Sequence, residues 1–317
     1  MIRAVVIAVL FAAPMAVADV PARLDQAFRG WVEDVGAQAA VMTVWEGGTH
    51  NSDVAIGMSA DTAVELASLG KAITALCVTD LIDKGIWAAE TTSSGVLGYG
   101  PDGITLARLM THSAGLGPDQ TQSDMPRWLD TAEDRSDDAA QQALRRDGQS
   151  GLSGSFSYNN ENYAILGAMI AAETGQSYAA YCKAAVLDRA GVTTAQISPR
   201  TGSMAAWGGW QMSVQDYARF MHWAYGPQGI IGSAPQNWPQ AAMGGGAFYG
   251  AGMTQRAFRG SMNYWHFGLL CFPERMTAGS YAVRWQEKWS VVVSFDRCLD
   301  WDQLFALDAA LARAVFQ

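Results

Sequence analysis

Lysine is scarce in this chain of 317 residues. Only Lys71, Lys84, Lys183 and Lys288 carry it, so a reaction that needs a lysine has few places to occur. Acidic residues exceed basic ones by 30 to 21, which gives a net charge of −9. An acidic chain without a cluster of basic residues is a poor partner for nucleic acid or for anionic lipid, and we expect neither.

Cysteine and histidine are also sparse, with four of each. Neither a C-x-x-C motif nor a histidine pair at helical spacing occurs, so we expect no metal site and no cofactor. Cys271 and Cys298 end two strand-like runs near the C-terminus and can pair with each other. Four buried thiols are the alternative, because spacing alone does not give connectivity.

No segment reads as a membrane-spanning helix, and the apolar run at residues 4–13 is short for one. That run follows Arg3 and precedes Ala16-Val17-Ala18, a small-x-small cleavage pattern. We predict a signal peptide over residues 1–18, cleaved after Ala18, and a periplasmic or secreted protein without a stable membrane anchor. A retained signal anchor is the alternative. Export implies an oxidising compartment, in which disulfides persist.

The chain does contain 50% hydrophobic residues, with strand-like patterns at both ends and helical patterns between them. Helical periodicity covers residues 22–35, 68–84, 104–111, 136–146, 161–185, 214–225 and 303–316. Strand-like runs cover residues 39–45, 53–57, 248–254, 264–272, 279–286 and 289–297. We predict an α+β fold, in which an antiparallel sheet from both chain ends is flanked by terminal helices and carries an inserted all-α domain.

In this prediction residues 19–317 form one hydrolase domain. Its sheet part covers about residues 19–67 and 247–317, and its helical part covers about residues 68–246.

Ser68-Leu69-Gly70-Lys71 is the first of three short motifs and opens the long helical run. Residues three apart share one face of a helix, so the hydroxyl and the amine meet. A buried Lys71 loses its proton by desolvation and can then accept the proton of Ser68. The helix N-terminus favours the negative charge that develops. A plain N-cap is the ordinary role of such a serine.

The second motif joins Tyr158 and Asn160, and the third joins His266 and Gly268. A tyrosine hydroxyl near a cationic lysine has a lowered pKa and can relay protons, while an asparagine can orient the lysine. Glycine in an edge strand permits close backbone approach, and the free N–H there can stabilise an oxyanion. Each motif alone is weak evidence, but all three fall in suitable elements.

Together the motifs resemble the serine β-lactamase and penicillin-binding-protein superfamily, in its class C-like branch. That branch includes class C β-lactamases, D-alanyl-D-alanine carboxypeptidases, D-amino-acid peptidases and serine esterases. The S-x-x-K motif is shared with class A enzymes, whereas a tyrosine in the second motif marks the class C-like branch. Residues 104–116, 156–167 and 208–220 resemble connecting segments of the branch, and the likeness spans about residues 38–297.

The resemblance implies a β-lactamase/transpeptidase-like fold and acyl transfer to Ser68, followed by hydrolysis. Lys71 would be the base, and Tyr158 would shuttle protons to the leaving group and from water. The backbone N–H groups of Ser68 and Leu269 would form the oxyanion hole. The substrate-binding positions that the resemblance implies are Asn160, His266, Gly268 and Leu269.

Three departures from the branch keep alternatives open. Gly70 stands where Ser, Thr or Met is usual, Phe267 is bulkier than the common residue, and His266 replaces a lysine and carries less charge. We predict an exported serine hydrolase whose partner is a small molecule or short peptide: small esters or amides, with D-amino-acid peptides and β-lactams as further candidates. The alternative is a catalytically weak or inactive penicillin-binding-like protein that binds cell-wall fragments.

His112 looks catalytic in isolation, but in the resembling family its segment is a structural loop, and we interpret it as structural. Trp207, Trp210 and Trp265 lie near motif segments. They are interpreted as core residues, with an apolar acyl pocket as the alternative.

Overall fold

The structure, a computed structural model, describes residues 19–146 and 154–317. The predicted signal peptide, residues 1–18, therefore lies outside the described residues. Among the residues described, no helix combines the length and the apolarity that a membrane span requires.

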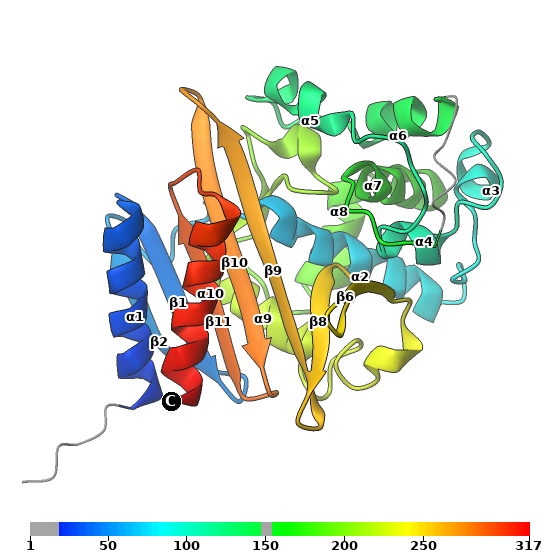
Figure 1. The fold of residues 1–317 in the computed structure, drawn as a ribbon. Coiled ribbons are helices and arrows are strands. Elements are labelled where there is room, and N and C mark those ends of the chain that lie inside the picture. Colours follow the sequence, from blue (N-terminus) through cyan, green and yellow to red (C-terminus); the bar gives the residue numbers. More distant parts are fainter. Residues whose placement is uncertain (1–18, 147–153) are drawn as a thin grey trace, which may run out of the picture.

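An antiparallel sheet of eight strands forms one half of the molecule (Figure 1). The strands are β1 (Ala40–Glu46), β2 (Thr49–Ile56), β6 (Ala241–Gly244), β7 (Ala247–Gly250), β8 (Met253–Phe258), β9 (Ser261–Phe272), β10 (Met276–Trp285) and β11 (Trp289–Phe295). Their order is β2-β1-β11-β10-β9-β8-β7-β6, and β1 pairs with β11 from Ala40↔Phe295 to Glu46↔Trp289. The prediction that both chain ends build one antiparallel sheet is confirmed.

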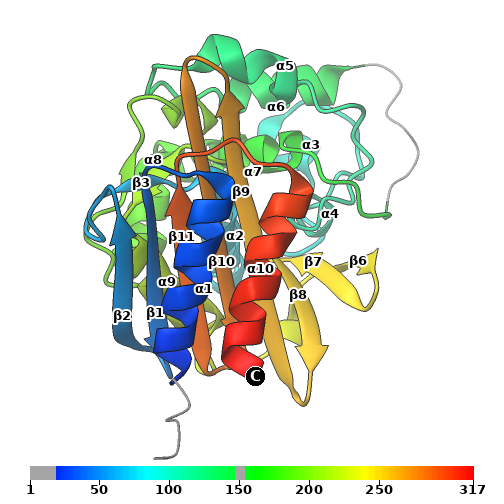
Figure 2. The same cartoon turned by 60° about the vertical axis from the view of Figure 1, so that its left-hand side comes forward.

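Helices α1 (Val20–Val35) and α10 (Trp301–Phe316) lie side by side on the outer face of this sheet (Figure 2). Each begins with an aspartate cap, in which Asp19 accepts from a first-turn N–H and Asp300 forms a capping box with Gln303. The apolar side of each helix packs on alternate strand residues such as Met42 and Val44. The predicted terminal helices are confirmed.

The remaining helices lie on the inner side of the sheet, some against it and others further away (Figure 1). They are α2 (Gly70–Asp83), α3 (Ser93–Leu97), α4 (Leu106–Met110), α5 (Thr121–Asp124), α6 (Ser136–Arg145), α7 (Glu161–Thr174), α8 (Tyr178–Cys182) and α9 (Val214–Tyr225). Short 3₁₀ turns are η1 (Ala67–Leu69), η2 (Met125–Trp128), η4 (Gly202–Met204) and η5 (Pro235–Asn237), and η3 (Lys183–Leu187) is a π-helical turn. Helix α2 is buried from Gly70 to Leu81, as its apolar surface on all sides predicts.

Three short strands within the helical half were not predicted: β3 (Val64–Glu65), β4 (Gln196–Ile197) and β5 (Trp210–Met212) form a second sheet in the order β3-β5-β4. The predicted strand at 248–254 is divided into β7 and β8 by a turn, in which Ala251 and Gly252 have φ of +49° and +80°. Strands of two or three residues are too short to show a period of two, which explains why the sequence pattern did not reveal them.

Two disulfides connect the four cysteines. The predicted pair Cys271–Cys298 is present. The second pair joins Cys77, on α2, to Cys182, at the end of α8, across 105 residues of sequence. It forms because α2 and α8 pack against each other, which neither cysteine's local sequence reveals.

Candidate active site

Ser68 lies in the turn η1 at the start of α2, where the chain runs against the inner face of β9. The residue before it, Ala67, has φ of +48°, a left-handed conformation that non-glycine residues rarely adopt. The neighbouring backbone holds this turn in place, because the Leu66 N–H donates to the Trp210 carbonyl at 2.9 Å and the Leu66 carbonyl accepts from Ser280 Oγ at 2.7 Å. Backbone strain of this kind clusters at functional sites.

Lys71 lies one helical turn further on and is completely buried. Its Nζ is 3.1 Å from Ser68 Oγ, 2.8 Å from Asn160 Oδ1 and 2.8 Å from the Trp207 carbonyl oxygen. The amide and carbonyl oxygens can only accept, so they hold two of the amine's hydrogens in either charge state. A neutral Lys71 therefore directs its lone pair at the Ser68 hydroxyl, which is the geometry of a base.

Burial lowers the pKa of Lys71 to about 7, and the nearby Asp119 carboxylate partly opposes that shift. A lysine in water is protonated at pH 7, whereas here a substantial fraction carries the free amine. The predicted loss of the Lys71 proton by desolvation is thus accounted for by its surroundings.

Tyr158 also reaches the nucleophile, since its hydroxyl donates to Ser68 Oγ at 2.9 Å. Its ring lies 5.0 Å from Lys71 Nζ, measured to the ring centroid. The sequence-based expectation of a lowered pKa is wrong: although 41% of the residue is exposed, desolvation by the protein packed around it raises the pKa of Tyr158 above its ordinary value. Tyr158 is therefore a neutral phenol near pH 7, able to donate its proton.

Asn160 begins α7 and connects Lys71 to two residues that the motifs did not reveal. Its side-chain Nδ2 donates to Thr121 Oγ1 at 3.1 Å, and its backbone N–H donates to Asp119 Oδ2 at 2.9 Å. Thr121 Oγ1 in turn donates to Asp119 Oδ1 at 2.6 Å. The polar run of residues 119–121 directly after the 104–116 segment was the available signal, but its link to Asn160 exists only in the fold.

The other side of the site is formed by β9, which is paired with β8 along only part of its length. β8 pairs with β9 only as far as Trp265, so among the described residues no strand pairs with this edge of β9 beyond that point, and η1 packs on the inner face of β9. Gly268 makes the close approach possible, because a Cβ there would lie 2.6 Å from the Leu66 carbonyl oxygen and 2.3 Å from Ser280 Oγ. Leu269 follows Gly268 on β9 and pairs with Gly279 of β10.

His266 lies on the inner face of β9 and is buried. One ring nitrogen, Nε2, is 3.2 Å from the Tyr249 hydroxyl, and the other, Nδ1, is 2.6 Å from the Phe267 carbonyl oxygen. Burial, with a smaller contribution from the charge of Lys71, lowers the pKa of His266 to about 3. His266 is therefore neutral near pH 7 and offers the site no positive charge.

Neither Phe267 nor Gly70 obstructs the site. The Phe267 ring points to the outer face, where it stacks on Tyr281 at 4.5 Å between ring centroids and meets Phe305 of α10. A Cβ at Gly70 would meet its nearest neighbours, which include Gly208, at 3.7 Å, an ordinary contact. Both departures from the family pattern therefore fit the packing around them without blocking access to Ser68.

His112 lies directly beneath Tyr158, with 4.3 Å between the ring centroids, and is buried. Its carbonyl accepts from the Ser157 N–H at 2.7 Å, and its Nδ1 is 3.0 Å from the Asn159 carbonyl oxygen. His112 thus holds the backbone on both sides of Tyr158, in keeping with a structural role. Trp207 and Trp210 are buried core residues, although the Trp207 carbonyl binds Lys71.

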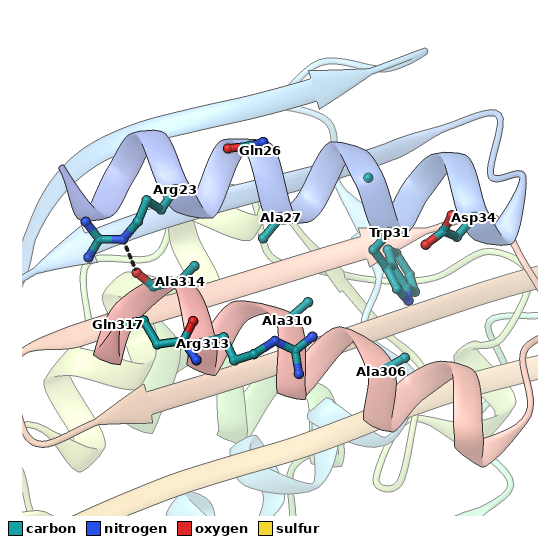
Figure 3. A pocket seen from close by; sticks show the side chains of 11 residues that line it. Arg23, Gln26, Ala27, Trp31, Asp34, Ala306, Ala310, Arg313, Ala314 and Gln317 are labelled. Atoms are coloured by element: carbon teal, nitrogen blue, oxygen red, sulfur yellow. Dashed lines mark hydrogen bonds between the residues drawn. The ribbon is translucent and has the colours of Figure 1, made fainter. Parts of the chain in front are cut away.

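A hollow of about 630 Å³ lies between α1 and α10 (Figure 3). Small side chains such as Ala306 and Ala310 leave this space, and Arg23 closes one end by donating to the Ala314 carbonyl at 2.8 Å. It lies on the outer face of the sheet, away from Ser68. Within residues 19–146 and 154–317, no group of three or more His, Cys, Asp or Glu side chains could hold a metal ion.

Known proteins resemble this chain in sequence and in fold. The profile of the family described as Beta-lactamase matches residues 24–297. Penicillin-binding protein 4* of Bacillus subtilis (strain 168) is 29% identical over 150 residues, which are 45% of this chain and 32% of the length of that protein. The chain therefore aligns with only about a third of this relative.

Two solved structures show the same fold at low sequence identity. The class C β-lactamase of Rhodobacter sphaeroides has a TM-score of 0.72 and 16% identity, covering 93% of this chain and 99% of that one. The D-amino acid amidase of Ochrobactrum anthropi SV3 has a TM-score of 0.72 and 16% identity, covering 94% and 99%. With the family match over residues 24–297, the conclusion is plain: this chain belongs to the Beta-lactamase family of serine hydrolases related to penicillin-binding proteins.

Proposed function

We propose that the protein is a serine hydrolase that cleaves small esters and amides without a carboxylate group through an acyl-enzyme on Ser68. One observation carries the proposal: the Ser68 hydroxyl contacts both a buried Lys71, whose pKa is lowered to about 7, and the neutral phenol of Tyr158. A base and an acid on the same nucleophile are the groups that acyl transfer needs.

In the proposed reaction, neutral Lys71 takes the Ser68 proton while Oγ attacks the acyl carbon. The N–H groups of Ser68 and Leu269 stabilise the oxyanion. Tyr158 gives its proton to the departing alcohol or amine and recovers one from Lys71. Water then attacks the ester, losing its proton through the same Tyr158–Lys71 pair, and Ser68 is released with its hydrogen.

The substrate class follows from the missing positive charge on β9. A substrate carboxylate beside the acyl group would meet the neutral ring of His266, which carries no positive charge to offset its lost hydration. Esters and amides without a carboxylate carry no such penalty. Amides of D-amino acids are included in the proposal because the D-amino acid amidase shares the fold.

Export belongs to the proposal as well. The two disulfides, Cys77–Cys182 and Cys271–Cys298, are supporting evidence, because such bonds persist in oxidising compartments.

The test is the intact mass of purified protein after incubation with a fluorophosphonate and, separately, with a penicillin, using Ser68→Ala as the control. One fluorophosphonate adduct that disappears in Ser68→Ala is the expected result. No adduct with either reagent would overturn the proposal and favour a binding protein for cell-wall fragments. A stable penicillin adduct without ester turnover would instead indicate a penicillin-binding role.

The substrate class is tested separately, by comparing a D-amino-acid amide with the matching dipeptide that ends in a free carboxylate. We expect turnover of the amide to exceed that of the dipeptide by at least about tenfold in kcat/KM. Equal turnover, or preference for the dipeptide, would contradict the assignment of substrates without a carboxylate.

A further inference from the structure

Asp119 lies outside the three motifs, in the loop between α4 and α5, yet its carboxylate ends a continuous hydrogen-bond chain that starts at Lys71. The chain runs from Lys71 Nζ to Asn160 Oδ1 at 2.8 Å and from Asn160 Nδ2 to Thr121 Oγ1 at 3.1 Å. It closes from Thr121 Oγ1 to Asp119 Oδ1 at 2.6 Å. Each group donates toward the carboxylate, so a single direction of all the hydrogens satisfies the chain.

Asp119 holds Asn160 in a second way as well. Its other oxygen, Oδ2, accepts the Asn160 backbone N–H at 2.9 Å, while Oδ1 also accepts the Thr121 backbone N–H at 2.9 Å. The carboxylate thus fixes the start of α7 and the start of α5 in one position. Because Asn160 is held at both its backbone and its amide, its Oδ1 is directed at Lys71.

Few charged groups surround the hydrogen-bond chain from Lys71 to Asp119. The side chains that face Lys71 are Tyr158, Tyr163, His112 and His266, and burial favours the uncharged form of each. On the side of Asp119, Arg146 is bound by both oxygens of Glu161 at 2.9 Å, which balances that pair of charges. The carboxylate of Asp119 raises the pKa of Lys71 against the effect of burial and likewise contributes to the raised pKa of Arg146.

We propose that Asp119 is a positioning residue of the active site, which orients Asn160 toward Lys71 and supplies the negative charge that acts on the Lys71 amine. This inference rests on the proposed function, since it assumes that Lys71 is the base for Ser68. Without Asp119, burial alone would govern Lys71, and the free amine would persist to lower pH. Its charge therefore places the working range of the base near neutral pH.

The test is the rate of fluorophosphonate adduct formation, followed by intact mass from pH 5 to 10. In the wild type we expect the rate to rise with pH around a midpoint near 7. Asp119→Asn removes the charge, so Lys71 binds its proton less tightly and the midpoint moves to lower pH, by at least about 0.5 units. Asp119→Glu keeps the charge and should keep the midpoint.

Thr121→Val is the matched control. It removes the hydroxyl that links the Asn160 amide to Asp119 and leaves the Asp119 carboxylate in place. We expect it to lower the rate at high pH several-fold through a misdirected Asn160, without moving the midpoint. An Asp119→Asn protein that labels with an unchanged or raised midpoint would overturn the inference. Asp119→Ser provides a second uncharged variant if Asp119→Asn does not fold. A wild type that does not label at Ser68 would defeat the proposed function itself, a distinguishable result.

Discussion

The two walls of the active site are built differently. The helical wall comprises Ser68, Lys71, Tyr158 and Asn160, and the strand wall comprises residues 266–269. The helical wall carries groups whose protonation the fold has shifted, each tied to Ser68 directly or through Lys71. The strand wall presents backbone, a glycine and an uncharged histidine ring. Proton transfer thus depends on the helical wall, whereas the strand wall brings its backbone close to the turn that carries Ser68.

Each wall also has its own covalent anchor. Cys77 lies on α2, the helix that carries Lys71, and is bonded to Cys182. Cys271 lies on β9, the strand that carries His266, and is bonded to Cys298. The two walls therefore differ in stability as well as in chemistry. Substitutions on each wall should have separate effects on the labelling rate of Ser68 and on the free energy of unfolding.

The largest expected effect comes from Lys71→Met. Without the amine nothing accepts the Ser68 proton, and the rate of fluorophosphonate labelling at pH 7.5 should fall at least about 10³-fold. Lys84→Met is the matched control, since Lys84 lies just after the same helix, is half-exposed, and pairs with Asp80, which also keeps Arg189 as a partner. Its labelling rate should equal that of the wild type. A Lys71→Met protein that keeps a tenth of the rate would show that another group is the base.

The two disulfides should differ in their contribution to stability. In the loop-entropy account, the 105-residue separation of Cys77–Cys182 corresponds to about 4.8 kcal/mol, and the 27-residue separation of Cys271–Cys298 to about 3.6 kcal/mol. The two double alanine variants, compared by urea unfolding, should therefore differ by about 1 kcal/mol in the free energy of unfolding. The reverse order would mean that the strand wall depends more on its anchor.

Gly268→Ala should disturb the strand wall directly. The added Cβ would meet the Leu66 carbonyl oxygen at 2.6 Å, so either β9 or the turn that carries Ser68 must move. We expect a loss of about 1–3 kcal/mol in the free energy of unfolding, together with slower labelling of Ser68. Gly30→Ala is the control: a Cβ at that position in α1 meets nothing within 4 Å, and it should stabilise the helix by about 0.5–1 kcal/mol. An unaltered Gly268→Ala protein would refute the close contact.

Local patterns predicted the features that depend on local physics. Helix α9 follows from the helical periodicity of residues 214–225, and the β10–β11 hairpin follows from two strand-like runs around a polar turn. The S-x-x-K spacing likewise places Ser68 beside Lys71, because both belong to one helical start.

What the patterns missed depends on segments that meet only in the fold. Asp119 and Thr121 have no periodic signal, and their meaning arises from contact with Asn160, far along the chain. Cys77 and Cys182 read as apolar helix residues until α2 packs on α8. The direction of the Tyr158 pKa was mispredicted for a related reason: desolvation was considered for Lys71 but not for Tyr158, for which only the proximity of a lysine was considered.

The smallest expected effect comes from His266→Gln, which replaces one uncharged hydrogen-bonding side chain with another. Since the pKa of His266 is lowered to about 3, the ring does not titrate where the enzyme is tested, and the labelling rate should change by less than about threefold. The rise of that rate around pH 7 belongs to Lys71 and should keep its midpoint. A midpoint that moves, or a rate that falls a hundredfold, would place a working charge on the strand wall. Proton transfer would then involve both walls, and not the helical wall alone.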